Sequence, residues 1–154
     1  MTVSVVNAGP GRISRSAQVQ ASASEIFDIV ADPRRHGELD GSGTVLTTVA
    51  GPGRLSQGAR FSVKMKQYGM PYKITSEVTA FAEGQLVEWR HPVGHRWRWE
   101  FEPLPDGSTL VTETLDYSHL GPAKAGGLRL SGMLQKDTAA IEATLRQLQT
   151  RYSG

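Results

Sequence analysis

Residues 127–152 carry the only long helical pattern in the chain. Large apolar residues recur there at spacings of seven, four, three and four, which is the stripe of a helix that buries one face. The residues of this stripe are Leu134, Ile141, Leu145, Leu148 and Tyr152. Burying each of them stabilises a fold by roughly 1.5–3 kcal/mol, but only where other apolar groups cover the stripe. The rest of the chain must therefore cover one long helix.

The opposite face of this helix is polar, and we expect its side chains to lie in water; they are Lys136, Glu142, Arg146 and Gln149. The preceding segment, residues 119–127, contains Pro122 and three glycines. Such a composition is typical of a loop, so we expect a flexible lead into the helix.

Upstream of this lead, apolar and polar residues alternate with a period of two, which is typical of strands that bury one face. These runs are residues 12–19, 44–50, 61–66, 72–78, 87–91, 96–102 and 111–117. In residues 96–102, three aromatic side chains point one way and four charged ones the other. Asp106-Gly107 is a hairpin signal. Short turns between consecutive strands indicate an antiparallel meander.

Two short helices are expected after the first strand. Ser22 to Glu25 form a capping box, in which the Ser22 hydroxyl accepts the Glu25 N–H and the Glu25 carboxylate reaches back. Asp32 and Pro33 end the first helix and begin the second, with Asp32 as its cap. The predicted fold class is therefore α+β: a curved antiparallel sheet of about seven strands around a long C-terminal helix. We expect one domain over residues 1–154.

Composition excludes several classes of protein. The chain has 154 residues, 38% hydrophobic and 21% charged, as in an ordinary globular domain. It has no cysteine, so disulfides and thiolate chemistry are excluded, and we expect a cytoplasmic protein. No signal peptide and no apolar run of ~18 residues is evident, so stable membrane insertion is not expected. A net charge of +2 from scattered basic residues gives no support for nucleic-acid binding.

Four fragments carry a resemblance to a known family: residues 21–27 (ASASEIF), 30–36 (VADPRRH), 86–90 (LVEWR) and 107–114 (GSTLVTET). With them the chain resembles the START/Bet v 1-like (SRPBCC) superfamily, in particular its bacterial polyketide cyclase/dehydrase and lipid-transport group. The resemblance covers nearly the whole chain and implies a helix-grip fold, with an apolar cavity between the sheet and the C-terminal helix. That group includes cyclases, hydroxylase domains, lipid carriers and plant ligand binders, so function has to be argued from the site.

The inward-facing side chains of the strands and the helix are the candidate ligand contacts. They are mostly apolar and aromatic, with a few polar groups that would orient a ligand. The candidates are Phe61, Val63, Met65, Tyr72, Ile74, Ser76, Val87, Trp89, His91, Trp97, Trp99, Glu113, Leu115, Tyr117, Leu134 and Ile141.

Glu113 and His91 are the catalytic candidates. If Trp99 lies opposite Glu113, and Trp89 opposite Trp99, then Glu113 is a carboxyl among indoles, where desolvation favours its protonated form. Such a carboxyl near an imidazole suits acid–base chemistry, for example enolising and dehydrating a poly-β-carbonyl chain. Alternatively, Glu113 only hydrogen-bonds a tryptophan N–H or a backbone group. His91, which precedes Pro92, either transfers protons or only lies at the opening of the cavity.

Three further side chains bear on the site. His36 and His119 are placed to reach the same mouth, from the second short helix and from the final loop. Arg15 has inward parity and would then need an anion from Glu113, Asp116 or a ligand carboxylate, unless it extends back into water. No two histidines have the spacing of a metal site and no His/Asp/Glu cluster occurs, so neither a metal nor another cofactor is expected.

These observations leave three functions open. The first is binding of a small hydrophobic ligand that is lipid-, polyketide- or aromatic-like. The second is a cofactor-independent polyketide cyclase or dehydratase that uses acid–base residues of the cavity. The third is a partner-binding module of the chaperone-ATPase-activator type, ranked last because the outer sheet face is charged. We expect a monomer or a homodimer.

Overall fold

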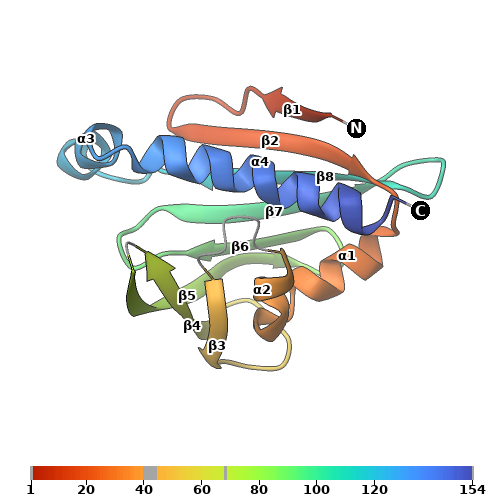
Figure 1. The fold of residues 1–154 in the computed structure, drawn as a ribbon, viewed down its shortest axis with the longest axis horizontal. Helices are drawn as coiled ribbons and strands as arrows, with labels where there is room; N and C mark the ends of the chain where they lie inside the picture. The colour runs from red at the N-terminus through yellow and green to blue at the C-terminus, as the bar shows by residue number, and fades with distance from the viewer. Residues whose placement is uncertain (1, 40–44, 68, 154) are drawn as a thin grey trace.

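The computed structural model describes residues 2–39, 45–67 and 69–153, with the backbone alone at 45–49 and 65–67. An eight-stranded sheet curves around one long helix (Figure 1). The strands are β1 (Val3–Val6), β2 (Arg12–Val19), β3 (Val45–Ala50), β4 (Arg60–Gln67), β5 (Met70–Ala82), β6 (Leu86–Arg90), β7 (Arg96–Pro103) and β8 (Thr109–Asp116). The helical elements are α1 (Ala23–Val30), the 3-10 turn η1 (Pro33–Arg35), α2 (His36–Leu39), α3 (Pro122–Leu130) and α4 (Met133–Arg151).

The strands lie in the order β1-β2-β8-β7-β6-β5-β4-β3, and every neighbouring pair is antiparallel. The α+β helix-grip architecture is thus confirmed. The sequence pattern did not predict β1, which pairs with residues 14–17 of β2. The turn between them contains Gly11 at φ +74°, where an added Cβ would lie 2.8 Å from the Ser118 Cα. Only glycine fits there, because the backbone is left-handed and a neighbouring chain approaches closely.

The two short helical segments after β2 form as predicted. The Ser22 hydroxyl accepts the backbone N–H of Glu25 at 3.3 Å and caps α1. The Asp32 carboxylate accepts the N–H of Arg34 at 3.0 Å and caps η1, with Pro33 in the first turn. α1 buries Ile26, Phe27, Ile29 and Val30 against the sheet.

The C-terminal third of the chain departs from the prediction. The expected single helix over residues 127–152 is two helices, because Gly132 adopts a left-handed conformation (φ +78°) between α3 and α4. The segment 119–127, expected to be a flexible lead, contains most of α3, with Pro122 in the first turn. None of the helices in the described ranges is long and apolar enough to cross a membrane.

α4 packs against β2 and β8 (Figure 1), and the apolar residues of its C-terminal half are the most deeply buried. Ile141, Leu145 and Leu148 are at most 2% exposed there. Gln149, expected in water, is buried, and its amide donates to the carbonyl oxygens of Thr2 and Gln18 at 3.3 and 3.1 Å. A buried amide is tolerated here because these backbone groups accept its hydrogen bonds.

The register of the central strands decides which side chains share the inner face. Trp99 lies opposite Glu113, as expected, because the Asp106-Gly107 turn fixes that hairpin. Trp89 lies opposite Trp97, so its expected pairing with Trp99 is wrong by two residues. A two-residue shift keeps side-chain parity, so these indoles remain on the inner face.

The outer sheet face is charged and internally paired. Glu88 is 6% exposed and accepts from the Arg96 and Arg98 guanidinium groups at 3.4 and 3.2 Å and from the Thr79 hydroxyl at 2.9 Å.

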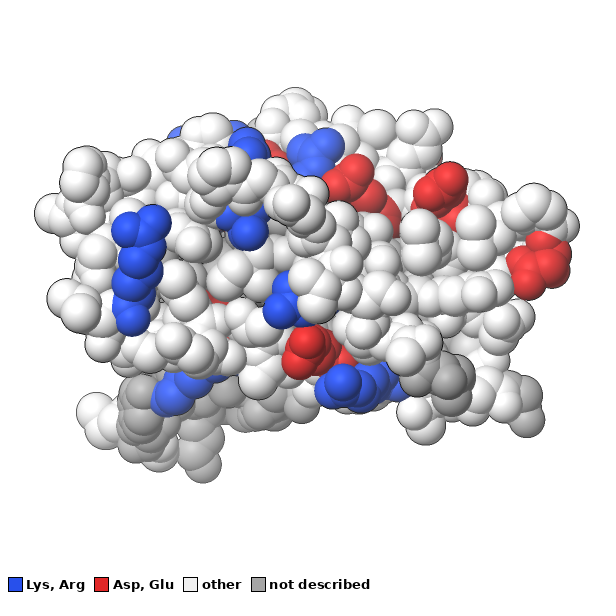
Figure 2. Space-filling model, turned by 90° about the horizontal axis from the view of Figure 1, so that it is seen from above, with Lys and Arg blue, Asp and Glu red and all other residues white. Residues whose placement is uncertain are grey.

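Seen from the side of β1, basic and acidic side chains are interspersed over the middle of the molecule (Figure 2). The small net charge is therefore not gathered into a single stripe on this face.

Candidate functional site

The residues expected to contact a ligand fall into two groups by burial. The fully buried ones, which form the core, are Phe61, Val63, Ser76, Val87, Trp99, Glu113, Leu115 and Ile141. The half-buried ones are Ile74, Trp89, His91, Trp97, Tyr117 and Leu134. Tyr72 is 38% exposed, and the side chain of Met65 lies outside the described part of the chain. The inner face is therefore closed in one region and incompletely covered in another.

The incompletely covered region lies under the N-terminal half of α4. Leu145 and Leu148 of the C-terminal half are fully buried, whereas Leu134 and Thr138 of the N-terminal half are only half-buried. The half-buried Trp97 and Tyr117 come from the ends of β7 and β8 that lie toward α3 (Figure 1). Large aromatic side chains with one uncovered side are suitable walls for an apolar ligand.

Asp137 lies within this region, and the sequence analysis missed it. It lies three residues after Leu134 and four before Ile141, so it shares their helix face. Burial raises the pKa of Asp137 to about 6. Burial and, secondarily, the charge of Asp137 raise the pKa of the Tyr72 phenol, which places β5 near this carboxyl. The seven-residue gap in the apolar stripe was the available signal, because the helical period puts a residue there on the inner face.

His36 is an inner-face histidine from α2 rather than a residue of the mouth. Its ring stacks on Trp89 at 5.0 Å and meets Phe61 edge-on at 5.4 Å. Its Nε2 atom lies 2.7 Å from the carbonyl oxygen of Val30, and a carbonyl only accepts, so Nε2 carries the proton. Burial lowers the pKa of His36, so the ring is a neutral spacer that holds Trp89 in place.

A pair of stacked histidines occupies the turn between β6 and β7. The rings of His91 and His95 lie 4.3 Å apart at 18°, and His95 meets Trp97 edge-on at 6.3 Å. The His91 Nδ1 atom accepts the Val93 N–H at 3.1 Å. Burial, followed by the neighbouring His91, lowers the pKa of His95 to about 4, and burial lowers the pKa of His91. The sequence analysis missed His95, although it precedes Trp97 by two residues and so shares its parity.

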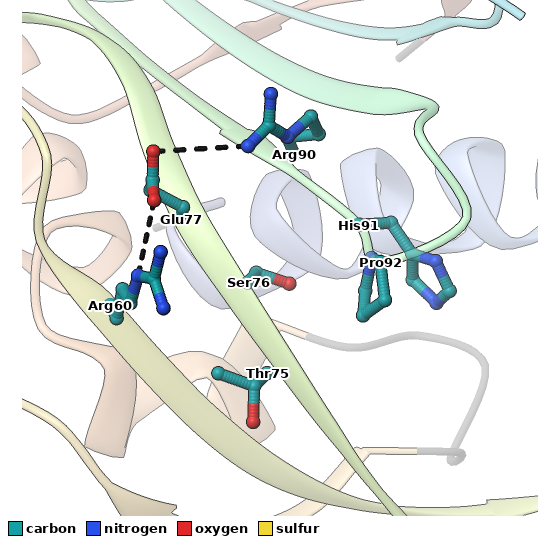
Figure 3. A pocket seen from close by; sticks show the side chains of 7 residues that line it. All are labelled: Arg60, Thr75, Ser76, Glu77, Arg90, His91 and Pro92. Atoms are coloured by element: carbon teal, nitrogen blue, oxygen red, sulfur yellow. Dashed lines mark hydrogen bonds and ion pairs between the residues drawn. The ribbon is translucent and has the colours of Figure 1, made fainter.

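A polar hollow of about 320 Å³ lies beside His91 (Figure 3). Its lining is Arg60, Thr75, Ser76, Glu77, Arg90, His91 and Pro92. β6 pairs with β5 only from Glu77 onward, so β5 runs past the end of its neighbour and leaves a gap at this point. The Glu77 carboxylate lies between two guanidinium groups, 3.1 Å from the Arg60 Nε and 3.9 Å from the Arg90 Nη2. These ion pairs connect the strands that line the hollow.

A second hollow, of about 370 Å³, lies between the start of β2 and α4. Its lining is Ile13, Leu134, Gln135, Thr138, Ala139 and Glu142. Arg15 does point toward the helix, and its Nε lies 3.0 Å from the Glu142 carboxylate. The anion that Arg15 needs is therefore Glu142 of α4, a residue expected to lie in water, and none of the three anions proposed from the sequence.

The remaining candidates are placed as follows. Glu113 is 7% exposed, between Arg15 of β2 and Trp99 of β7 in the register of the sheet. His119 lies at the surface, with its Nε2 atom 3.5 Å from the Asp116 carboxylate, away from the inner face. Among the described residues, no group of three or more His, Asp and Glu side chains could hold a metal ion.

A curved sheet that grips one helix and is incompletely closed at one end defines the helix-grip class of ligand-binding folds. The chain belongs to the polyketide cyclase / dehydrase and lipid transport family, whose model matches residues 10–153. It is 56% identical to the uncharacterized protein Rv0088 of Mycobacterium tuberculosis over 155 residues, which cover 99% of this chain and 69% of that protein.

Two solved structures illustrate the fold. Protein Ms6760 of Mycobacterium smegmatis has a TM-score of 0.72 at 19% identity, covering 99% of this chain and 98% of that one. The di-domain ARO/CYC StfQ from the steffimycin biosynthetic pathway has a TM-score of 0.66 at 13% identity, covering 93% of this chain and 50% of that one. At these identities the likeness shows the fold alone.

Proposed function

We propose that the chain binds a small hydrophobic ligand, lipid-, polyketide- or aromatic-like, between the sheet and the N-terminal half of α4. The observation that carries this proposal is the gradient of burial along the inner face. Trp89, Trp97 and Tyr117 are half-buried, and so is Leu134 in the N-terminal half of α4. Trp99 is 3% exposed, and Leu145 in the C-terminal half of α4 is fully buried. The family and the fold support a ligand-binding module of this kind.

The polar groups near this region would orient the ligand. Asp137 lies near enough to Tyr72 for its charge to raise the pKa of the phenol, and His91 lines the hollow at the gap between β5 and β6. Apolar walls with a few convergent polar groups are typical of small-molecule sites. A ligand with an apolar body and one hydroxyl or carbonyl group suits this arrangement.

Native mass spectrometry of the freshly purified protein tests the proposal, because a bound small molecule adds a discrete mass. Leu134→Trp should displace that molecule by filling the space beneath α4. Thr150→Trp is the matched control, since it adds the same indole at an exposed position of the same helix. No added mass in the parent protein, together with no saturable binding of an apolar fluorophore, would overturn the proposal.

A second candidate is cofactor-independent acid–base catalysis on a poly-β-carbonyl substrate. The raised pKa of Asp137, about 6, favours it, because a general acid or base works best with a pKa near the operating pH. Glu113 and His91 remain the candidates proposed from the sequence. Turnover of a poly-β-carbonyl thioester should fall in Asp137→Asn, Glu113→Gln and His91→Ala. Unchanged turnover in all three variants would leave ligand binding as the function.

A further inference from the structure

Large apolar side chains are exposed mainly at one end of the molecule. In the described part of the chain they are Val5 (73%), Met70 (70%), Tyr72 (38%), Val93 (41%) and Leu130 (91%). All but Val5 belong to the β4–β5 hairpin, the β6–β7 turn and α3, which share the left end of the ribbon (Figure 1). A hydrogen bond connects α3 to the β6–β7 turn, because the Lys124 amino group donates to the Val93 carbonyl at 3.2 Å.

α3 is the most exposed element of this end. None of its residues is buried, and Leu130 at its C-terminal end is almost fully exposed. Lys124 donates to the Val93 carbonyl, and the Arg129 guanidinium lies 5.9 Å from the Tyr117 ring. Leu130 therefore gains almost none of the stabilisation that a buried leucine gives a fold.

The exposed charges next to these apolar side chains are positive, and the Asp137 carboxyl near Tyr72 is half-buried. α3 contains Lys124 and Arg129 and no acidic residue, and the exposed Lys73 follows Tyr72 on β5. These three cations take part in none of the ion pairs between described residues. In Figure 2 a basic side chain stands at the α3 end, while the acidic side chains seen plainly lie toward the middle and the opposite end.

We propose that this end of the molecule adsorbs reversibly to the surface of an anionic lipid bilayer. The docking rim consists of Met70, Tyr72, Val93 and Leu130, with Lys73, Lys124 and Arg129 between them. Exposed apolar groups enter the headgroup region, and interleaved cations attract anionic lipids. The proposal rests on the proposed function in one respect, because docking this rim would bring the incompletely covered end of the ligand site to the bilayer.

The layout of the rim favours a membrane over a protein partner. Its apolar side chains project from a helix end, a hairpin and a turn, and so do not form one continuous face. A fluid interface accommodates separate projecting groups, whereas a stable protein interface needs a continuous surface of about 800 Å² per partner with a packed, complementary core. Adsorption of this kind requires no membrane-spanning helix.

Vesicle flotation with the full chain tests the docking rim. We expect binding to vesicles in which a third of the lipid is phosphatidylglycerol, weaker binding at high salt, and little binding to pure phosphatidylcholine. Replacing Lys124 or Arg129 by Gln should weaken binding about fivefold per cation, at ~1 kcal/mol for each. Leu130→Ser should weaken it about tenfold, and the matched control Val5→Ser should leave it unchanged.

Two results would overturn docking: no vesicle binding, or equal losses in Val5→Ser and Leu130→Ser. A stable protein complex formed through Leu130 in the absence of vesicle binding would assign the rim to a protein partner instead. Native mass spectrometry of Leu130→Ser keeps the two proposals apart. A retained small molecule with lost vesicle binding supports both. Vesicle binding by a protein that carries no small molecule and shows no saturable binding of an apolar fluorophore supports docking and overturns the ligand site.

Discussion

Replacing Asp137 by asparagine should stabilise the protein at neutral pH. The carboxyl is half-buried on the inner stripe of α4, and burial raises its pKa from 3.8 to about 6. A shift of this size corresponds to about 3 kcal/mol at ~1.36 kcal/mol per pKa unit. Because the side chain keeps some contact with water, we expect about half of that, ~1–2 kcal/mol. Asparagine has nearly the same shape and cannot ionise.

The pH dependence fixes the sign of this effect. The folded state holds the Asp137 proton more tightly than the unfolded state, so the free energy of unfolding falls as pH rises from about 4 through about 6. Asp137→Asn should therefore be more stable than the parent at pH 8 and equal to it at pH 4. Below about 4 both states carry the proton, so the difference vanishes.

Urea unfolding followed by tryptophan fluorescence at pH 4, 6 and 8 measures this difference. Glu102→Gln, at an exposed carboxyl of β7, is the matched control and should change stability by less than ~0.5 kcal/mol at each pH. Loss of stability in Asp137→Asn at pH 8, or a gain that does not vary with pH, would refute the reasoning. Weaker binding of the co-purified molecule by the stabilised variant would assign Asp137 to the ligand.

Three further predictions concern the fold. The free energy of unfolding should fall as pH drops from 6.5 to 4, because the His95 imidazole has a pKa of about 4 in the folded state and is protonated first in the unfolded chain. His95→Phe should remove part of this fall, and urea unfolding at pH 5 and 7 measures the difference. Leu145→Ala should cost about 2–5 kcal/mol in thermal unfolding, whereas Leu130→Ala should cost less than ~0.5 kcal/mol. Ser22→Ala should cost about 0.5–2 kcal/mol by loss of the cap of α1, and Ser22→Asp should restore most of it.

Most strands, turns and short helices could be predicted from the sequence, because residues close together in the chain determine them. Alternation placed Trp97 and Trp99 on the inner face, and the Asp106-Gly107 turn fixed Trp99 opposite Glu113. The β6–β7 connection, from His91 to His95, has the same length but contains no Asp-Gly signal, so the sequence did not fix its register and the partner of Trp89 was predicted wrongly.

The missed features depend on tertiary contacts or on glycine conformation. Gly132 splits the C-terminal helix because it turns left-handed, which the helical period alone cannot indicate. Gln149 is buried because backbone carbonyls from distant segments accept its hydrogen bonds. Asp137 and His95 were not predicted for another reason: they are polar residues at inward positions of patterns that apolar residues define.

The central claim is that a ligand lies between the sheet and the N-terminal half of α4. Isotope-filtered NMR with labelled protein and unlabelled anilinonaphthalene sulfonate tests it directly, because proton–proton contacts are seen only over short distances. We expect saturable contacts from the probe to the Trp97 indole and the Leu134 methyl groups. Contacts confined to the outer sheet face or to Val5, with none to Trp97, would contradict it.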